Sequence, residues 1–309
     1  MTKIFSGNKV ALSEIDLSIV NGETVGILGN NGSGKTTLLR ILATLLYPAY
    51  FTKFELFGLN PISEATRIKP LIGYLPERFS FYPYFTVNEV LDFFEQLQAV
   101  DRDDQEEHRE RILKILGLDS YLDVRINALS KGMLHKVGLG ITLIHDPPLL
   151  LLDEPTSGLD PLVRAQVRKI LMDITADFDK TILLSSHILE DVEAICDRVF
   201  FLESGKMLHN EPFLFKDLKK RFSLMHRLSV RFNDTFTPPG GLVDLDNVLY
   251  RDVHPKGMEI YCKKVDGPDV IKQIKERLEE NIETVFHPIT LEDIYILNNA
   301  RINWMDFLS

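Results

Sequence analysis

The sequence has few cysteines and lacks a long apolar run. Cys196 and Cys262 are the only cysteines among 309 residues, which excludes a framework of several disulfides and a zinc site with four thiolates. A reduced, cytosolic chain is the simplest interpretation. No stretch reaches the ~18 apolar residues of a membrane span, and residues 1–9 lack the apolar core of a signal peptide. A role at a membrane would therefore depend on a partner chain.

Positive charge is also in the minority. The chain has 35 lysines and arginines against 45 aspartates and glutamates, a formal net charge of −10. Because a strongly acidic protein repels polyanions, we expect no nucleic-acid partner, and any bound anion must be held by a local site. Hydrophobic residues make up 45% of the chain, as in ordinary folded proteins, and this argues against extended disorder.

The hydrophobic pattern divides the chain into two parts, and two domains are typical of this length. In residues 1–215, short apolar segments alternate with helical periodicity, which predicts an α/β fold with a mainly parallel sheet. An antiparallel β subdomain is expected at the start of this part, and a helical insert at about residues 86–146. Residues 216–309 combine strand-like segments with one amphipathic helix, which predicts a small accessory or regulatory α+β domain.

Local signals place the first strands and helices. Residues 15–19 alternate apolar and polar side chains and precede Asn21-Gly22, which predicts a hairpin with a strand at residues 24–28. Further strands are expected at residues 54–57 and 72–75. The later helices are predicted from capping signals and periodicity, at residues 86–97, 104–116, 130–144, 162–178 and 268–278.

A glycine-rich loop joins the strand at residues 24–28 to a helix. Its sequence fits the phosphate-binding pattern G-x-x-x-x-G-K-[ST] (Walker A), in which backbone amides cradle phosphate oxygens. Lys35 supplies a point charge for the β and γ phosphates, and the Thr36 hydroxyl suits Mg²⁺. The predicted triphosphate-binding residues are Gly29, Asn30, Asn31, Gly32, Ser33, Gly34, Lys35, Thr36 and Thr37.

Two carboxylates follow four consecutive leucines. Residues 149–152 predict a buried strand, and Asp153 and Glu154 stand at its carboxyl end. Asp153 is placed to bind Mg²⁺, and Glu154 can orient and polarise the attacking water. The loop and this pair together indicate a site that hydrolyses a nucleoside triphosphate.

Three further motifs carry a family resemblance. Residues 129–133, Leu-Ser-Lys-Gly-Met, resemble the signature sequence of ATP-binding subunits of ABC transporters. Residues 157–160, Ser-Gly-Leu-Asp, resemble the D-loop of that family, and His187 resembles its switch histidine. Phe5 stands where such proteins place an aromatic ring against adenine. The resemblance covers about residues 3–210, and residues 288–295 are similar to the tail of subunits that serve drug, lipid or polysaccharide exporters.

The resemblance implies a P-loop ATPase core and a role for each motif. ATP and Mg²⁺ would be the ligands, with His187 at the γ-phosphate and Thr36, Asp153 and Glu77 at the metal. Glu77 departs from the family pattern, which usually has glutamine there, and we expect it to tighten metal dependence. The signature residues Ser130, Lys131, Gly132 and Met133 would cap ATP bound to a second ATP-binding subunit, and Asp160 would belong to the same interface.

The resemblance also implies partners and a location. A homodimeric or heterodimeric sandwich would bind a multi-span membrane permease at the cytoplasmic face of the membrane, and the tail similarity favours export. One alternative is a soluble ABC-type ATPase that acts in translation or DNA maintenance, although such proteins carry two cassettes or long coiled coils. A P-loop kinase or GTPase would leave Ser130, Asp160 and His187 without roles.

Overall fold

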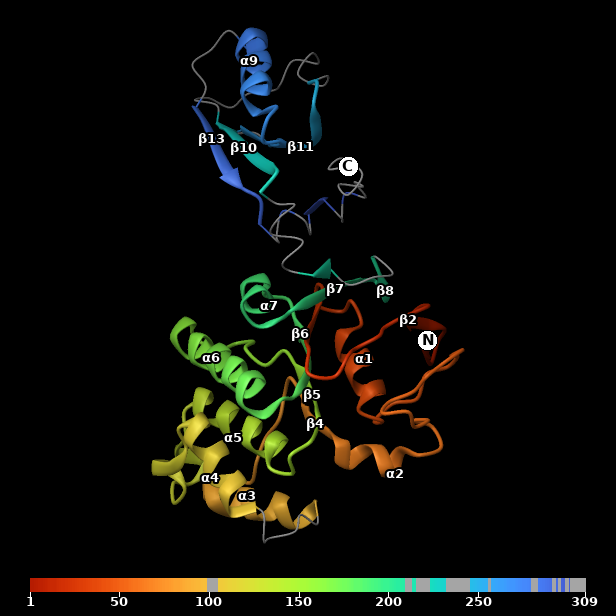
Figure 1. The fold of residues 1–309 in the computed structure, drawn as a ribbon, viewed down its shortest axis with the longest axis vertical. Coiled ribbons are helices and arrows are strands. Elements are labelled where there is room, and N and C mark those ends of the chain that lie inside the picture. The colour runs from red at the N-terminus through yellow and green to blue at the C-terminus, as the bar shows by residue number, and fades with distance from the viewer. Residues whose placement is uncertain are drawn as a thin grey trace. The chain divides into compact units, whose positions relative to one another are not determined.

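The structure is a computed structural model (Figure 1). It describes residues 1–98, 105–208, 213–214, 223–231, 245–254, 257–278, 283–290, 293, 296–297 and 300. The chain forms two compact units, Met1–Phe213 and Leu214–Ser309. The domain boundary expected between residues 215 and 216 lies outside the described residues, and the accessory role of the second part stays a prediction.

The first unit is built on a seven-stranded sheet. Its strands are β3 (Thr24–Leu28), β4 (Ile72–Leu75), β5 (Leu149–Asp153), β6 (Thr181–Ser186), β7 (Arg198–Glu203), β8 (Lys206–Met207) and β9 (Phe213–Leu214). The order is β4-β5-β6-β3-β7-β8, with β9 also paired to β7. Pairing from β4 through β7 is parallel. Every residue of β3, β5 and β6 is buried, as central parallel strands require. The predicted α/β architecture is confirmed.

Helices cover both faces of this sheet (Figure 1). One face carries α1 (Lys35–Leu42), whose apolar side chains share a core with Leu151 of β5 and Val25 of β3. The opposite face carries α6 (Pro161–Phe178) and α7 (Leu189–Ile195). Gly26 of β3 allows α7 to approach closely, since a Cβ there would lie 2.6 Å from a Val192 methyl carbon.

The predicted helical insert is present. It contains α3 (Val87–Leu97), α4 (Gln105–Leu116), α5 (Lys131–Leu143) and the short 3-10 helices η2 (Asp119–Tyr121) and η3 (Ile126–Ala128). The capping box at the start of α3 is confirmed. The Glu89 amide donates to Thr86 Oγ1 at 3.1 Å, and the Thr86 amide donates to Glu89 Oε2 at 2.8 Å. A further short helix, α2 (Ala65–Ile68), is followed directly by the 3-10 helix η1 (Lys69–Leu71).

Two strand predictions near the start are wrong. Residues 15–20 form no strand, and β3 pairs in parallel with β6 and β7 instead of closing a hairpin through Asn21-Gly22. Both edges of β3 are occupied by these partners, so no edge remains for residues 15–19. Their alternation reflects burial, because Ile15 lies in the core while the neighbouring polar residues do not. Residues 54–57 also form no strand, although Phe54 is buried in the same core.

Antiparallel pairing at the amino terminus involves β1 (Lys3–Phe5) and β2 (Lys9–Leu12). In the second unit a four-stranded antiparallel sheet has the order β11-β12-β10-β13. Its elements are β10 (Met225–Arg231), β11 (Val248–His254), β12 (Gly257–Lys263), α9 (Gly267–Leu278) and β13 (Glu283–Pro288). Val270 and Ile274 of α9 share a core with residues of β10 and β12, as the periodicity of this helix predicted. The outer strands β11 and β13 were not predicted.

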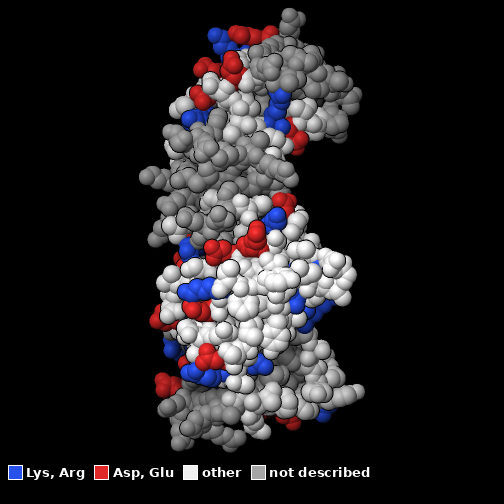
Figure 2. All heavy atoms as spheres, turned by 90° about the vertical axis from the view of Figure 1, so that its right-hand side faces the viewer, with Lys and Arg blue, Asp and Glu red and all other residues white. Residues whose placement is uncertain are grey.

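Charged side chains of both signs are interspersed over the face of the described residues seen in Figure 2, with uncharged surface between them. The net charge of −10 indicates that the positive charge that a phosphate ligand needs comes from individual residues of a site.

Candidate active site

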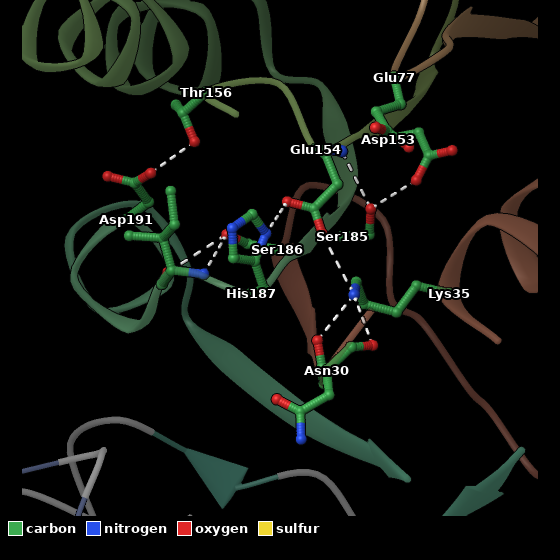
Figure 3. Close-up of polar contacts among 12 residues, drawn as sticks. Asn30, Lys35, Glu77, Asp153, Glu154, Thr156, Ser185, Ser186, His187 and Asp191 are labelled. Carbon is green, nitrogen blue, oxygen red and sulfur yellow. Dashed lines mark hydrogen bonds and ion pairs between the residues drawn. The ribbon is translucent and has the colours of Figure 1, made fainter. Parts of the chain in front are cut away.

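The predicted catalytic residues meet at one edge of the parallel sheet. Parallel strands β3, β5 and β6 end there together, with Leu28 beside Ser186 and Asp153 beside Ser185. The glycine-rich loop leaves β3, the two carboxylates end β5, and His187 follows β6 directly. Figure 3 shows the Lys35, Glu154 and His187 side chains pointing toward one another. Ligands of open α/β sheets bind at this edge.

The glycine-rich loop is folded tightly around the Lys35 ammonium. A Cβ on Gly29 would lie 2.2 Å from the Leu202 carbonyl oxygen, and Gly34 has a φ of 113°, so both positions require glycine. Lys35 is 5% exposed. Its Nζ donates to the carbonyl oxygens of Gly29 at 2.7 Å and Asn30 at 3.2 Å. The loop therefore holds a buried cation at the amino terminus of α1, where an anion is favoured.

Glu154 is held between two basic side chains. Its Oε1 lies 3.1 Å from Lys35 Nζ, and its Oε2 lies 2.7 Å from His187 Nδ1. Glu154 is 6% exposed and His187 is 38% exposed, so the histidine links the carboxylate to solvent. The Glu154 backbone has a φ of 53°, a left-handed conformation that costs free energy for a residue with a side chain. The Ser185 hydroxyl stabilises this conformation, because its oxygen accepts a hydrogen bond from the Glu154 amide at 3.0 Å.

Asp153 has the environment of a cation ligand. Its Oδ1 accepts hydrogen bonds from Thr36 Oγ1 at 3.1 Å and from Ser185 Oγ at 2.8 Å. Its Oδ2 is buried, and no described residue forms a hydrogen bond with it. Burial raises the pKa of Asp153, and the two hydroxyl hydrogen bonds oppose that rise. A buried carboxylate oxygen without a partner beside a hydroxyl fits a hard divalent cation.

That cation would have few protein ligands. In the part of the chain that the structure describes, no group of three or more His, Cys, Asp or Glu side chains is placed to hold a metal. Thr36 and Asp153 would then share the cation with phosphate oxygens and water, as Mg²⁺ sites commonly do. Glu77 is 45% exposed and lies 3.7 Å from Arg78 Nε, so its role as a metal ligand stays a prediction.

A hollow of about 690 Å³ is bordered by Lys35, Glu154 and His187, whereas Asp153 is not among its lining residues. Phe5 is 39% exposed and lies at its wall with the glycine-rich loop, and its role in adenine stacking stays a prediction. Of the residues predicted from the sequence, the hollow is lined by Phe5, Asn31, Gly32, Gly34, Lys35, Thr36, Thr37, Glu77, Glu154 and His187.

The signature residues lie at a helix tip that does not line this hollow. Ser130 caps α5, because its Oγ accepts from the Met133 amide at 3.3 Å. Asp160 caps α6 in the same way, through the Val163 amide at 3.1 Å. Lys131 Nζ donates to the Gly158 carbonyl at 2.6 Å and so ties the two tips together. In one chain, therefore, the signature and the glycine-rich loop do not face the same hollow.

Ser185, Thr156 and Asp191 contribute to this edge and were missed by the sequence reasoning. Ser185 bonds both Asp153 and Glu154. Its signal was present, since two serines interrupt an otherwise apolar strand at its carboxyl end. Nothing in the sequence indicated that Asp191 bonds Thr156, because the two residues lie 35 positions apart.

The parallel sheet, the glycine-rich loop and the carboxylate pair define a P-loop nucleoside triphosphatase. Comparison with known proteins defines the class further. The ABC transporter family, ABC_tran, matches residues 12–157. The ABC transporter ATP-binding protein NatA of Bacillus subtilis is 38% identical over 200 residues, which cover 64% of this chain and 80% of NatA.

Two further comparisons extend the match. The Nod factor export ATP-binding protein I of a Bradyrhizobium strain is 36% identical over 298 residues, 96% of this chain and 93% of that protein. The dimeric structure of the ATP-binding cassette MJ0796 in a post-hydrolysis state, bound to ADP and phosphate, is similar with a TM-score of 0.58 and 26% identity. The similarity covers 69% of this chain and 96% of the MJ0796 chain.

The chain belongs to the ABC transporter ATP-binding protein family, and it is an ATPase that binds ATP. Proteins of this family pair with one another and work with membrane permeases. Across the residues that the structure describes, no helix is both long and apolar enough to cross a membrane.

Proposed function

We propose that this protein drives export through a separate membrane permease, to which it binds at the cytoplasmic face of the membrane. Support comes from the Nod factor export relative, whose similarity extends over 96% of the chain and so includes the second unit. The NatA match covers 64% of the chain. The names of these relatives are those of transporter subunits, so nothing favours the alternative of an ATPase in translation or DNA maintenance.

The proposed chemistry follows from the contacts of Glu154. The glycine-rich loop would hold the triphosphate, with Lys35 toward its β and γ phosphates. Thr36 and Asp153 would hold Mg²⁺, and Glu77 is a further candidate ligand. Glu154 acts as the general base toward the attacking water. His187, whose ring already contacts Glu154 at 2.7 Å, holds the γ-phosphate. The single observation that carries this proposal is the buried Glu154 carboxylate between Lys35 and His187.

A second ATP-binding subunit would complete the site. Ser130, Lys131, Gly132 and Met133 surround a helix tip whose amides attract anions, yet the tip does not line the hollow of its own chain. We propose that this tip, with Asp160, caps ATP held by the partner. Closure on ATP and opening after hydrolysis would then move the permease.

Glu154→Gln tests the proposed chemistry. The variant should bind ATP as well as the unmodified protein but lose at least about 100-fold in turnover, because general-base catalysis contributes about 10²–10⁴-fold. ATP binding is measured by calorimetry, turnover by phosphate release, and dimer formation by analytical ultracentrifugation. With ATP the variant should accumulate as a closed dimer. Turnover near that of the unmodified protein contradicts the role of Glu154.

Ser130→Arg tests the partner contribution, because an arginine at the helix tip blocks the approach of the second subunit. ATP binding to the monomer should be unchanged and ATPase activity lost. Equal loss of both would contradict a signature that acts on the partner's nucleotide. The permease is sought by pull-down from detergent-solubilised membranes, and recovery of the protein without any multi-span partner would contradict the transport role.

A further inference from the structure

A buried polar cluster behind the active site has no part in the chemistry proposed above. Asp191 is 1% exposed and uses both carboxylate oxygens. Oδ2 accepts the Thr156 hydroxyl, and Oδ1 lies 3.2 Å from Arg168 Nη1. We name Thr156, Arg168 and Asp191 the Asp191 cluster. Taking a carboxylate out of water costs free energy, and these bonds offset part of that cost.

The cluster joins the two chain segments that carry the catalytic side chains. Thr156 is the second residue after Glu154, and Asp191 is the fourth residue after His187. Figure 3 shows the Thr156–Asp191 bond on one side of the site and the Glu154–His187 contact nearer its centre. A shift of either segment would therefore change both contacts together.

Glu154 needs support on both sides in the chain. Its left-handed backbone, with a φ of 53°, is unfavourable for an L-residue and persists only where neighbours over-determine it. On the amino-terminal side, its amide bonds Ser185. On the carboxyl-terminal side, the loop turns back on itself through the Ser157 amide, which donates to the Glu154 carbonyl at 3.0 Å. Thr156, between these residues, is the one tied to a separate helix, through Asp191 on α7.

We propose that Asp191 is a positioning residue for ATP hydrolysis, which acts through Thr156 to hold Glu154 within reach of His187. This inference rests on the roles proposed above for Glu154 and His187. Catalysis is sensitive to such positioning, since misplacement of a reacting group by about 1 Å can cost about 100-fold in rate. ATP binding depends on the glycine-rich loop, and among the described residues no hydrogen bond joins this loop to the Asp191 cluster, so ATP binding should change little.

The test compares two variants of Thr156 in the purified full-length protein. Thr156→Val removes the hydroxyl at nearly constant volume, and Thr156→Ser retains it. Thr142→Val is the matched control, because Thr142 is also buried, at 4% exposed, and donates its hydroxyl to the Gly138 carbonyl at 2.8 Å within α5. For each variant, kcat and KM for ATP are measured with saturating Mg²⁺, together with the dissociation constant for ATP.

Thr156→Val should lower kcat by at least about tenfold with KM and the dissociation constant changed less than about twofold, the signature of an interaction used in the transition state. Thr156→Ser and Thr142→Val should keep kcat within about twofold of the unmodified protein. Three results would overturn the proposal. The kcat of Thr156→Val could equal that of the unmodified protein, Thr142→Val could lose as much kcat as Thr156→Val, or Thr156→Val could raise KM without changing kcat.

A second measurement asks whether Asp191 and Thr156 act as one unit. The double variant Asp191→Ala with Thr156→Val should have a kcat no lower than that of Asp191→Ala alone, and multiplied losses would contradict the proposal. If Asp191→Ala does not fold, the Thr156 comparison decides. Glu154→Gln separates this inference from the proposed function: loss of turnover in Glu154→Gln with normal kcat in Thr156→Val overturns only the role of Asp191.

Discussion

The buried ion pair between Lys35 and Glu154 leads to a stability prediction that can be made quantitative. The two groups are 3.1 Å apart and 5% and 6% exposed. At an effective dielectric constant of about 20, their attraction is about 5 kcal/mol before desolvation is counted. Breaking a buried pair from one side typically costs about 3–5 kcal/mol, because the remaining charge stays buried without its partner. Lys35→Met should therefore lower the free energy of unfolding of the nucleotide-free protein by about 3 kcal/mol.

The remaining contacts refine this magnitude. Glu154→Gln should cost less, about 2 kcal/mol, because Lys35 keeps the carbonyl oxygens of Gly29 and Asn30. The double variant Lys35→Met with Glu154→Gln should lose about 2 kcal/mol less than the sum of the two single losses, because neither charge is then left buried without its partner. Glu154→Gln also frees Lys35 for phosphate, so its affinity for ATP should be equal to or above that of the unmodified protein.

Urea unfolding of the full-length protein, followed by circular dichroism without nucleotide or Mg²⁺, measures these values. Lys53→Met is the control, because Lys53 and Glu55 are also 3.1 Å apart but 78% and 53% exposed. An exposed pair contributes at most about 1 kcal/mol. If Lys35→Met is no more destabilising than Lys53→Met, the reasoning from burial is refuted.

Three further predictions concern packing and titration. Gly132→Ala should weaken ATP-driven dimer formation in ultracentrifugation, because its Cβ would lie 2.5 Å from a Val163 methyl carbon, and Val163→Ala in the same chain should restore it. Asp293→Ala should lower the free energy of unfolding by about 3 kcal/mol in urea, because Arg227 loses its 2.8 Å contact and keeps Glu259 at 3.4 Å, and the buried Tyr261 hydroxyl loses its acceptor at 3.1 Å. A loss below that of Lys53→Met would count against this role. Burial raises the pKa of Cys262 from 9.0 to about 11, so its thiol ionises at lower pH in the unfolded chain than in the folded one. The free energy of unfolding should therefore fall as the pH rises from 9 toward 11. Alkylation of Cys262 by iodoacetamide should be about 100-fold slower in the native protein, and equal rates in the native and unfolded proteins would contradict the raised pKa.

The motifs with strict local spacing could be located from the sequence. The glycine-rich loop starts where predicted because a strand, a close backbone approach at Gly29 and a left-handed Gly34 are encoded within a few residues. The caps at Thr86 and Ser130 were likewise readable, since a hydroxyl bonds an amide three residues later. The tail contains a bond of the same kind: Thr290 Oγ1 accepts from the Asp293 amide at 3.3 Å, and residues 291, 292, 294 and 295 lie outside those described.

Sheet pairing could not be read in the same way. The Asn21-Gly22 turn is a strong hairpin signal, yet β3 pairs with β6 and β7, from residues more than 150 positions away. The alternation at residues 15–19 reflects burial against the core of the first unit and does not identify a partner strand. The outer strands β11 and β13 escaped prediction because edge strands are only partly buried and their apolar pattern is weak.

The sequence by itself determined the chemistry of this protein: a phosphate loop, a carboxylate pair after a buried strand, and a capped signature helix, each written within a few consecutive residues. Only the tertiary structure decided how these parts meet. It placed Glu154 between Lys35 and His187, bonded Ser185 to both carboxylates, and tied Thr156 to Asp191. The physical reason is that hydrogen bonds within a motif follow from local spacing, whereas contacts across a parallel sheet depend on strand order and register, which long-range burial sets.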